Sequence, residues 1–70
     1  MNLQINGEKE ILEDANISIS KLLELKSVKM PDMVSVELNG EIIDRSAFDT
    51  TQLKDHDEVE FLYFMGGGQL

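Results

Sequence analysis

The stretch Val34-Ser35-Val36-Glu37-Leu38-Asn39-Gly40-Glu41-Ile42-Ile43 decides the fold of this chain. Its first half, residues 34–38, alternates apolar and polar side chains, which is typical of a strand with one buried face. The Asn-Gly pair at 39–40 favours the tight turn of a two-residue β-hairpin. Residues 41–43 then return as a second strand. The stretch therefore predicts an antiparallel hairpin.

A second hairpin is predicted at the N-terminus. Leu3-Gln4-Ile5 alternates in the same way and is also followed by an Asn-Gly pair, at 6–7. Residues 8–12 would form the returning strand, with a weaker pattern because Ile11 and Leu12 are its apolar residues.

Between the two hairpins, the spacing of apolar residues predicts one short helix. Ile19, Leu22 and Leu23 fall on a single helical face. Ser18 precedes them and can accept a hydrogen bond from a free N–H of the first turn. We expect the helix to end near Lys26, since Pro31 and its polar neighbours oppose a long continuation.

The second half of the chain contains an irregular segment and a final strand. Residues 44–54 lack a strong period, and Phe48 and Leu53 are expected to anchor a loop or a turn of 3₁₀ helix. Asp55-His56-Asp57 reads as a solvated turn, which is a better interpretation than a metal site for one histidine beside carboxylates. The last strand is expected over residues 58–65.

Two hairpins, a crossover helix and a final strand define the predicted architecture. Placing the final strand beside the first, in the middle of the sheet, buries the most apolar residues. The fold class is therefore α+β, a β-grasp (ubiquitin-like) fold with a mixed five-stranded sheet and one main helix packed on one face. Residues 1–65 would form the domain and residues 66–70 a flexible glycine-rich tail.

Length and composition argue for a small carrier or binding module. A chain of 70 residues makes one domain. A domain of this size buries only about 60% of its unfolded surface, which leaves little room for a deep active-site cleft. No set of acid, base and nucleophile converges and no nucleotide-binding loop occurs, so we expect no enzyme, no catalytic residue, no metal and no cofactor bound by this chain.

The net charge and the absence of cysteine restrict which partners and which cellular compartment we expect for this chain. The net charge of −8 argues against nucleic acid and against anionic membranes, and it favours a protein partner with a basic face. Solubility alone is an equally acceptable explanation of the charge. With no cysteine, no signal peptide and no membrane span, we expect a cytoplasmic monomer.

The last strand is predicted to present apolar residues beside the tail. Strand alternation places Glu58, Glu60, Leu62 and Phe64 on one face, and Val59, Phe61, Tyr63 and Met65 on the other. Burying the carboxylate of Glu60 unpaired would be costly, so the first face should be the open one. We predict a partner-binding site of Leu62, Phe64 and Met65. The alternative is that the loop around Phe48 covers Leu62 and Phe64.

The tail Gly66-Gly67-Gly68 is the candidate functional segment. Glycine has no Cβ, so a run of three stays thin and resists regular structure. Such a tail suits a chain end that must thread through a narrow channel into another protein's active site. Composition alone also allows a terminus without function.

Almost the whole sequence resembles the sulfur-carrier proteins of thiamine biosynthesis, the ThiS family within the ThiS and MoaD group of ubiquitin-like proteins. The resemblance is carried by four segments and the glycine tail: Leu3-Gln4-Ile5-Asn6-Gly7, Ser18-Ile19-Ser20-Lys21-Leu22-Leu23, Val34 to Ile43 with Arg45-Ser46, and Asp57-Glu58-Val59-Glu60-Phe61 leading to Gly66-Gly67-Gly68. The segment from Val36 to Ile42 and the tail are the most specific parts.

The resemblance implies a sulfur-carrying tail and two enzyme partners. An E1-like, ThiF-like enzyme would adenylate the terminal glycine carboxylate with ATP, which that partner binds. A persulfide would then deliver sulfur, and the resulting thiocarboxylate would donate it to a ThiG-like thiazole synthase. The sulfur-carrying tail is assigned to Gly66, Gly67 and Gly68.

The sequence departs from the family pattern because Gln69 and Leu70 follow Gly68. A processing protease would have to remove them, unless they were added for expression or the protein is not a working carrier. Either Gly67 or Gly68 could be the active terminus. The alternatives to thiamine are a related processed carrier for another pathway (molybdopterin, an amino acid or another metabolite) and a non-catalytic β-grasp adaptor.

Overall fold

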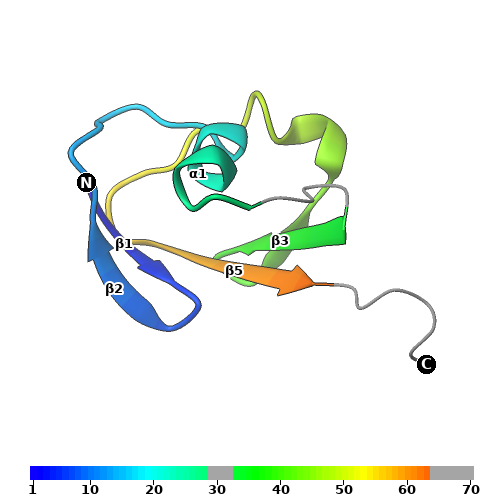
Figure 1. Ribbon diagram of the computed structural model, residues 1–70, viewed down its shortest axis with the longest axis horizontal. Coiled ribbons are helices and arrows are strands. Elements are labelled where there is room, and N and C mark those ends of the chain that lie inside the picture. Colours follow the sequence, from blue (N-terminus) through cyan, green and yellow to red (C-terminus); the bar gives the residue numbers. More distant parts are fainter. Residues whose placement is uncertain (29–32, 64–70) are drawn as a thin grey trace.

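The computed structural model describes residues 1–28 and 33–63 of the 70-residue chain. The elements follow the predicted order and end with the central strand (Figure 1). They are β1 (Asn2–Ile5), β2 (Glu8–Ile11), α1 (Ile19–Leu25), β3 (Val34–Leu38), β4 (Glu41–Ile43), the 3₁₀ turn η2 (Arg45–Ala47) and β5 (Asp57–Tyr63).

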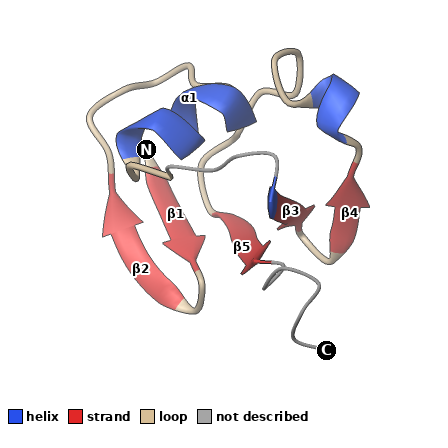
Figure 2. Cartoon of the chain, turned by 45° about the vertical axis from the view of Figure 1, so that its right-hand side comes forward, coloured by secondary structure: helices blue, strands red, loops and turns tan. Residues whose placement is uncertain are grey.

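The described residues form one five-stranded sheet in the order β2-β1-β5-β3-β4. β5 pairs in parallel with β1 and antiparallel with β3, and both hairpins are antiparallel. α1 lies across one face of the sheet, and the other face is open (Figure 2). The predicted mixed sheet, with the last strand in the middle and one helix on one face, is confirmed.

The two hairpin turns follow from their Asn-Gly pairs. Asn6 and Gly7 have φ of 52° and 85°, and Asn39 and Gly40 have φ of 52° and 90°. Two successive left-handed residues give a turn whose twist matches that of the strands, and Asn-Gly is the pair that adopts it most easily.

α1 begins and packs as its sequence pattern predicts. The Ser18 hydroxyl accepts a hydrogen bond from Lys21 N–H at 3.1 Å, which caps the first turn. Ile19, Leu22 and Leu23 are buried against the sheet, and Lys26 caps the C-terminus. Burying side chains of this size contributes about 1.5–3 kcal/mol each, which exceeds what the intrinsic propensity of seven residues can supply.

The core lies between α1 and the sheet and is closed by the segment after β4. Phe48 and Leu53 are buried there, as expected, and η2 supplies the predicted 3₁₀ turn. The buried core residues are Leu3, Ile5, Ile17, Ile19, Leu22, Leu23, Val34, Val36, Phe48, Leu53, Val59 and Phe61.

Tyr63 of the last strand is exposed, although it lies on the face of the sheet that α1 covers. Tyr63 was expected on the inner face with Val59 and Phe61, but 56% of its surface is exposed. Its cross-strand partner is the buried Val34, so Tyr63 does face the helix side. It lies at the end of β5, where more than half of its surface stays accessible. The predicted face of Tyr63 is confirmed, and its exposure is a feature that strand alternation alone does not give.

Candidate functional site

The candidate site combines the open sheet face with the end of β5. β5 ends at Tyr63, two residues before Met65 and three before Gly66. The predicted site residues Phe64, Met65, Gly66, Gly67 and Gly68 lie outside the described residues. Leu62 is the predicted partner-binding residue that the structure describes.

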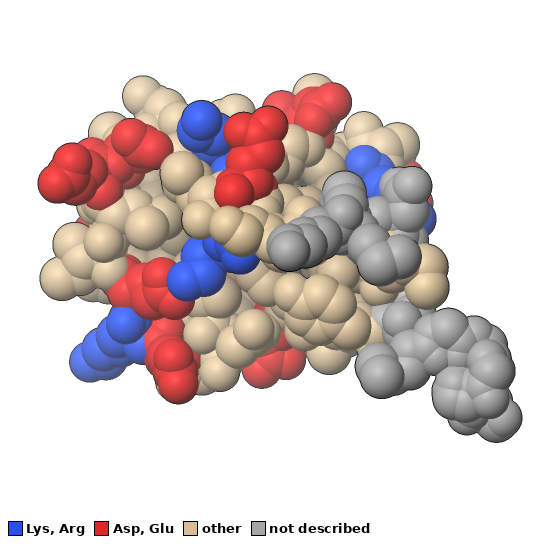
Figure 3. All heavy atoms as spheres, viewed as in Figure 1, with Lys and Arg blue, Asp and Glu red and all other residues tan. Residues whose placement is uncertain are grey.

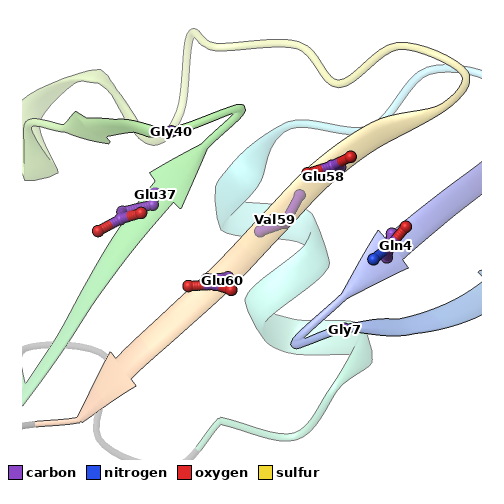
Figure 4. Close-up of a pocket in the computed structure, with 7 residues that line it drawn as sticks. All are labelled: Gln4, Gly7, Glu37, Gly40, Glu58, Val59 and Glu60. Carbon is purple, nitrogen blue, oxygen red and sulfur yellow. The ribbon is translucent and has the colours of Figure 1, made fainter.

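Three glutamates gather on the open face beside β5. Glu58 and Glu60 come from β5 and Glu37 from β3, and with Gln4 of β1 they line a hollow between the two hairpin turns (Figure 4). They share a face because Glu37 is the cross-strand partner of Glu60, and Gln4 is that of Glu58. Sequence reasoning identified Glu58 and Glu60 on this face but missed Glu37.

Among residues 1–28 and 33–63, no basic side chain neutralises this acidic group. None of the three carboxylates forms an ion pair with a described lysine or arginine. Glu37 and Glu60 lie directly opposite each other, an arrangement that destabilises a sheet when the charges are alike. Figure 3 shows acidic side chains distributed over the visible face of the molecule, with basic ones among them. The open face therefore favours a partner that brings positive charge.

Two asparagine side chains hold β5 from opposite sides. Asn39 Oδ1 accepts a hydrogen bond from Glu58 N–H at 2.9 Å, and Asn39 Nδ2 donates to Asp57 Oδ1 at 3.0 Å. Asn6 Oδ1 accepts from Phe61 N–H at 2.9 Å. Sequence reasoning missed these contacts, although the two Asn-Gly pairs were the signal that could have located them.

Leu62 is accessible at the end of β5. It is 40% exposed and lies on the open face opposite Ser35. Phe48 belongs to the core on the helix side, where its carbonyl accepts a hydrogen bond from Ser20 N–H at 3.1 Å. The loop around Phe48 therefore does not cover Leu62, and the alternative of a covered Leu62 is wrong.

The Asp55-His56-Asp57 turn has a structural role. His56 has a φ of 71°, and its N–H donates to Asn2 O. Asp55 Oδ1 accepts from Asn2 N–H at 2.6 Å, and this bond is the main cause that lowers the pKa of Asp55. Within residues 1–28 and 33–63, no three potential metal ligands lie close enough together to hold an ion.

The helices among the described residues lack the length and apolar character needed to cross a membrane. Fold and site together define a β-grasp protein of the ubiquitin-like class, with an open acidic sheet face and a glycine tail after its central strand.

Comparison with known proteins places the chain within that class. The ThiS family model matches residues 2–68. The crystal structure of the thiamine biosynthesis protein ThiS from Geobacter metallireducens is 49% identical, with a TM-score of 0.87 over 97% of this chain and all of that one. A solution structure of a thiamine biosynthesis protein from the same organism is also 49% identical, with a TM-score of 0.81 over all of this chain and 91% of that one. The chain belongs to the ThiS family.

A longer protein contains a related sequence. A thiazole synthase from Magnetococcus marinus is 30% identical over 69 residues, which cover 99% of this chain and 21% of that protein. The chain thus spans about a fifth of the length of this relative. Membership of the ThiS family makes the chain a small sulfur carrier rather than a catalyst, as the sequence predicted.

Proposed function

We propose that this chain carries sulfur for thiazole formation in thiamine biosynthesis, as a thiocarboxylate on its C-terminal glycine. The observation that carries the proposal is the match to the ThiS family over residues 2–68, together with the 49% identity to a thiamine biosynthesis protein. The thiazole synthase that contains a related sequence supports a ThiG-like enzyme as the sulfur acceptor.

The chemistry needs an activated carboxylate, which the glycine tail can present. A ThiF-like enzyme transfers AMP from ATP to the carboxylate and releases pyrophosphate. The terminal sulfur of a persulfide attacks the acyl carbonyl and AMP leaves. A thiol then cleaves the resulting S–S bond and is oxidised to a disulfide, which frees the thiocarboxylate. Glycine leaves the carbonyl open to attack because it has no side chain.

Processing of the C-terminus forms part of the proposal. Gln69 and Leu70 lie beyond the region that the family model matches, which ends at Gly68. A protease removes them and exposes Gly68, or Gly67 if one more residue is lost. With Leu70 in place, the carboxylate offered to the adenylating enzyme would belong to a bulky residue.

Intact mass of the untagged protein from its native host, grown without thiamine, tests the proposal. We expect a chain ending at Gly67 or Gly68, part of it heavier by the mass difference between one sulfur and one oxygen atom. A chain that always ends at Leu70 and never gains sulfur would contradict the proposal and favour a non-catalytic adaptor.

Three purified chains identify the active terminus. Proteins ending at Gly67, Gly68 and Leu70 are each incubated with ATP and the ThiF-like enzyme of the same genome, and pyrophosphate release is followed. We expect release from one glycine-ending chain and none from the chain ending at Leu70. Equal release from all three would show that no processing is required.

Docking through Leu62 is the second part of the proposal, with Phe64 and Met65 as its predicted neighbours. Leu62→Glu and Phe64→Glu should weaken binding to the adenylating enzyme. Ile11→Glu is the matched control, because Ile11 is 79% exposed and opposes Asn2 at the far edge of the sheet. Equal binding by Leu62→Glu and Ile11→Glu, with both folded, would remove Leu62 from the docking surface.

A further inference from the structure

The backbone groups of β5 are hydrogen-bonded along more of the strand on the β3 side than on the β1 side. On the β3 side, Asn39 N–H donates to Glu58 O at 2.7 Å, and pairing runs on to Val34 opposite Tyr63. Because backbone groups alternate in direction along a strand, the residues that bond to β3 are the even-numbered ones. Phe61 and Tyr63 therefore direct their N–H and C=O groups towards the β1 side.

On the β1 side, pairing stops halfway along β5. The last pair of the two strands is Ile5 with Val59, and Asn6 N–H donates to Val59 O at 2.9 Å. Asn6 Oδ1 then accepts from Phe61 N–H. β1 turns back at Gly7, while β5 continues past it (Figure 4). No described residue pairs with Phe61 C=O or with Tyr63 N–H and C=O on this side.

Phe61, Leu62 and Tyr63 therefore form a half-edge, a stretch of β5 that is paired with β3 on one side only. This half-edge lacks the features that prevent pairing with other chains at the outer strands β2 and β4. β2 carries Glu8, Lys9 and Glu10, and β4 is three residues long. Charged side chains and short strands are the usual means by which edge strands avoid pairing with other chains. The half-edge has no charge and no proline, and its two aromatic residues, Phe61 and Tyr63, favour strands. It is also the segment that leads into the glycine tail.

The geometry points to strand addition at this half-edge by an extended main-chain segment of the thiazole synthase that accepts sulfur from the tail. Unpaired backbone donors and acceptors select another extended backbone, and exposed side chains on alternate faces supply specificity. Leu62 and Tyr63 provide such side chains, at 40% and 56% exposure on opposite faces. A second copy of this chain is a poor occupant, since both copies carry a net charge of −8.

This inference rests on the proposed function, and amide exchange tests it directly. The probe is the thiazole synthase of the same genome, mixed with the full chain labelled for NMR. Strand addition should slow exchange of the Tyr63 amide at least about tenfold on binding, because the amide gains a hydrogen-bond acceptor. The Leu62 amide, which faces β3, is the internal reference for general protection. Binding with no added protection at Tyr63 would overturn the inference.

A pair of variants separates the backbone of Tyr63 from its side chain. Tyr63→Ala and Tyr63→Pro both remove the ring, but the proline also removes the N–H that faces the empty side. Proline is tolerated where a strand's N–H points away from its neighbour, so β3 pairing should survive. We expect Tyr63→Pro to bind the thiazole synthase about tenfold more weakly than Tyr63→Ala, the effect of one lost hydrogen bond. Equal affinities of the two folded variants would also overturn the inference.

The two levels of proposal fail in different ways. A wild-type chain that gains sulfur and binds the synthase, but leaves the Tyr63 amide exposed, retains the carrier function and loses strand addition. A wild-type chain that neither gains sulfur nor binds the synthase loses both. If Tyr63→Pro does not fold, the exchange measurement on the wild-type chain still decides.

Discussion

The two hairpins of this protein contain the same Asn-Gly dipeptide, but the two turns contact different parts of β5. Both Asn-Gly turns have left-handed backbones, and both asparagines accept a hydrogen bond from a backbone N–H of β5. They therefore hold the central strand from both sides. Similar local sequence has produced similar local structure, including contacts to a strand that is remote in the sequence.

The two asparagines differ in the part of β5 that each one contacts. Asn39 contacts the start of β5, where Asp57 Oδ1 also accepts from its amide. Asn6 contacts Phe61, and strand pairing on that side ends there. One turn fixes where the central strand begins, and the other marks where its neighbour stops. An identical turn can thus complete a sheet at one place and leave it open for a partner at another.

Asn39→Ala should give the largest effect on the comparison. It removes two side-chain hydrogen bonds and forces alanine into a left-handed backbone, which together should cost about 2–3 kcal/mol of unfolding free energy. Urea denaturation measures the loss as a lower midpoint with an unchanged slope. Asn39→Gly is the control, because glycine accepts the positive φ and loses only the side-chain bonds. Equal stability of wild type and Asn39→Ala would show that these bonds contribute nothing.

Asn6→Gly should have a smaller and more local effect. The turn keeps its geometry, and the single bond to Phe61 N–H is lost, at a cost of about 1 kcal/mol. Amide exchange at Phe61 should accelerate, whereas exchange at Glu58 should not. If both amides respond equally, the two ends of β5 are coupled and the contrast between the turns is lost.

Glu60→Gln should produce a still smaller change, of opposite sign. It relieves the repulsion between Glu60 and Glu37 and should stabilise the fold by about 0.5 kcal/mol, less in high salt. Glu58→Gln is the matched control, because its cross-strand partner on β1 is the neutral Gln4. Should Glu60→Gln also weaken binding to the ThiF-like enzyme, the opposed charges would serve docking at the expense of stability.

Sequence reasoning reached the fold because its strongest signals were local. The two Asn-Gly pairs, the alternation around them and the Ser18 cap each depend on neighbouring residues, and all three are confirmed. The contacts it missed join distant positions, since Asn6 and Phe61 are 55 residues apart. The exposure of Tyr63 was missed for the same reason, because it depends on where the helix and the other elements end.

The starts of β1 and β3 extend the comparison to charged groups. Asp55 Oδ1 accepts a hydrogen bond from Asn2 N–H at the start of β1, and Arg45 Nη2 donates to Val34 O at 3.2 Å at the start of β3. The bond from Asn2 N–H is the main cause that lowers the pKa of Asp55 below its ordinary value of 3.8, and the nearby His56 adds to it. Hydrogen bonds from Ser46 lower the pKa of the Asp44 carboxyl and Arg45 adds to this effect, so removing Arg45 would itself change stability in a pH-dependent way.

Asp55→Asn should therefore show a pH-dependent loss of stability that Asn6→Gly, which removes a hydrogen bond between two neutral groups, does not share. A carboxylate with a lowered folded pKa contributes its stability above the unfolded value of 3.8, and that contribution is lost as the pH falls through the lowered value. The gap between wild type and Asp55→Asn in urea unfolding should be largest at neutral pH and should shrink below about pH 3.8. The gap for Asn6→Gly should stay constant over this range, because neither the amide nor the backbone N–H titrates there. A constant gap for both variants would mean that the Asp55 bond forms equally well when its carboxyl is protonated, so that geometry rather than charge holds the start of β1.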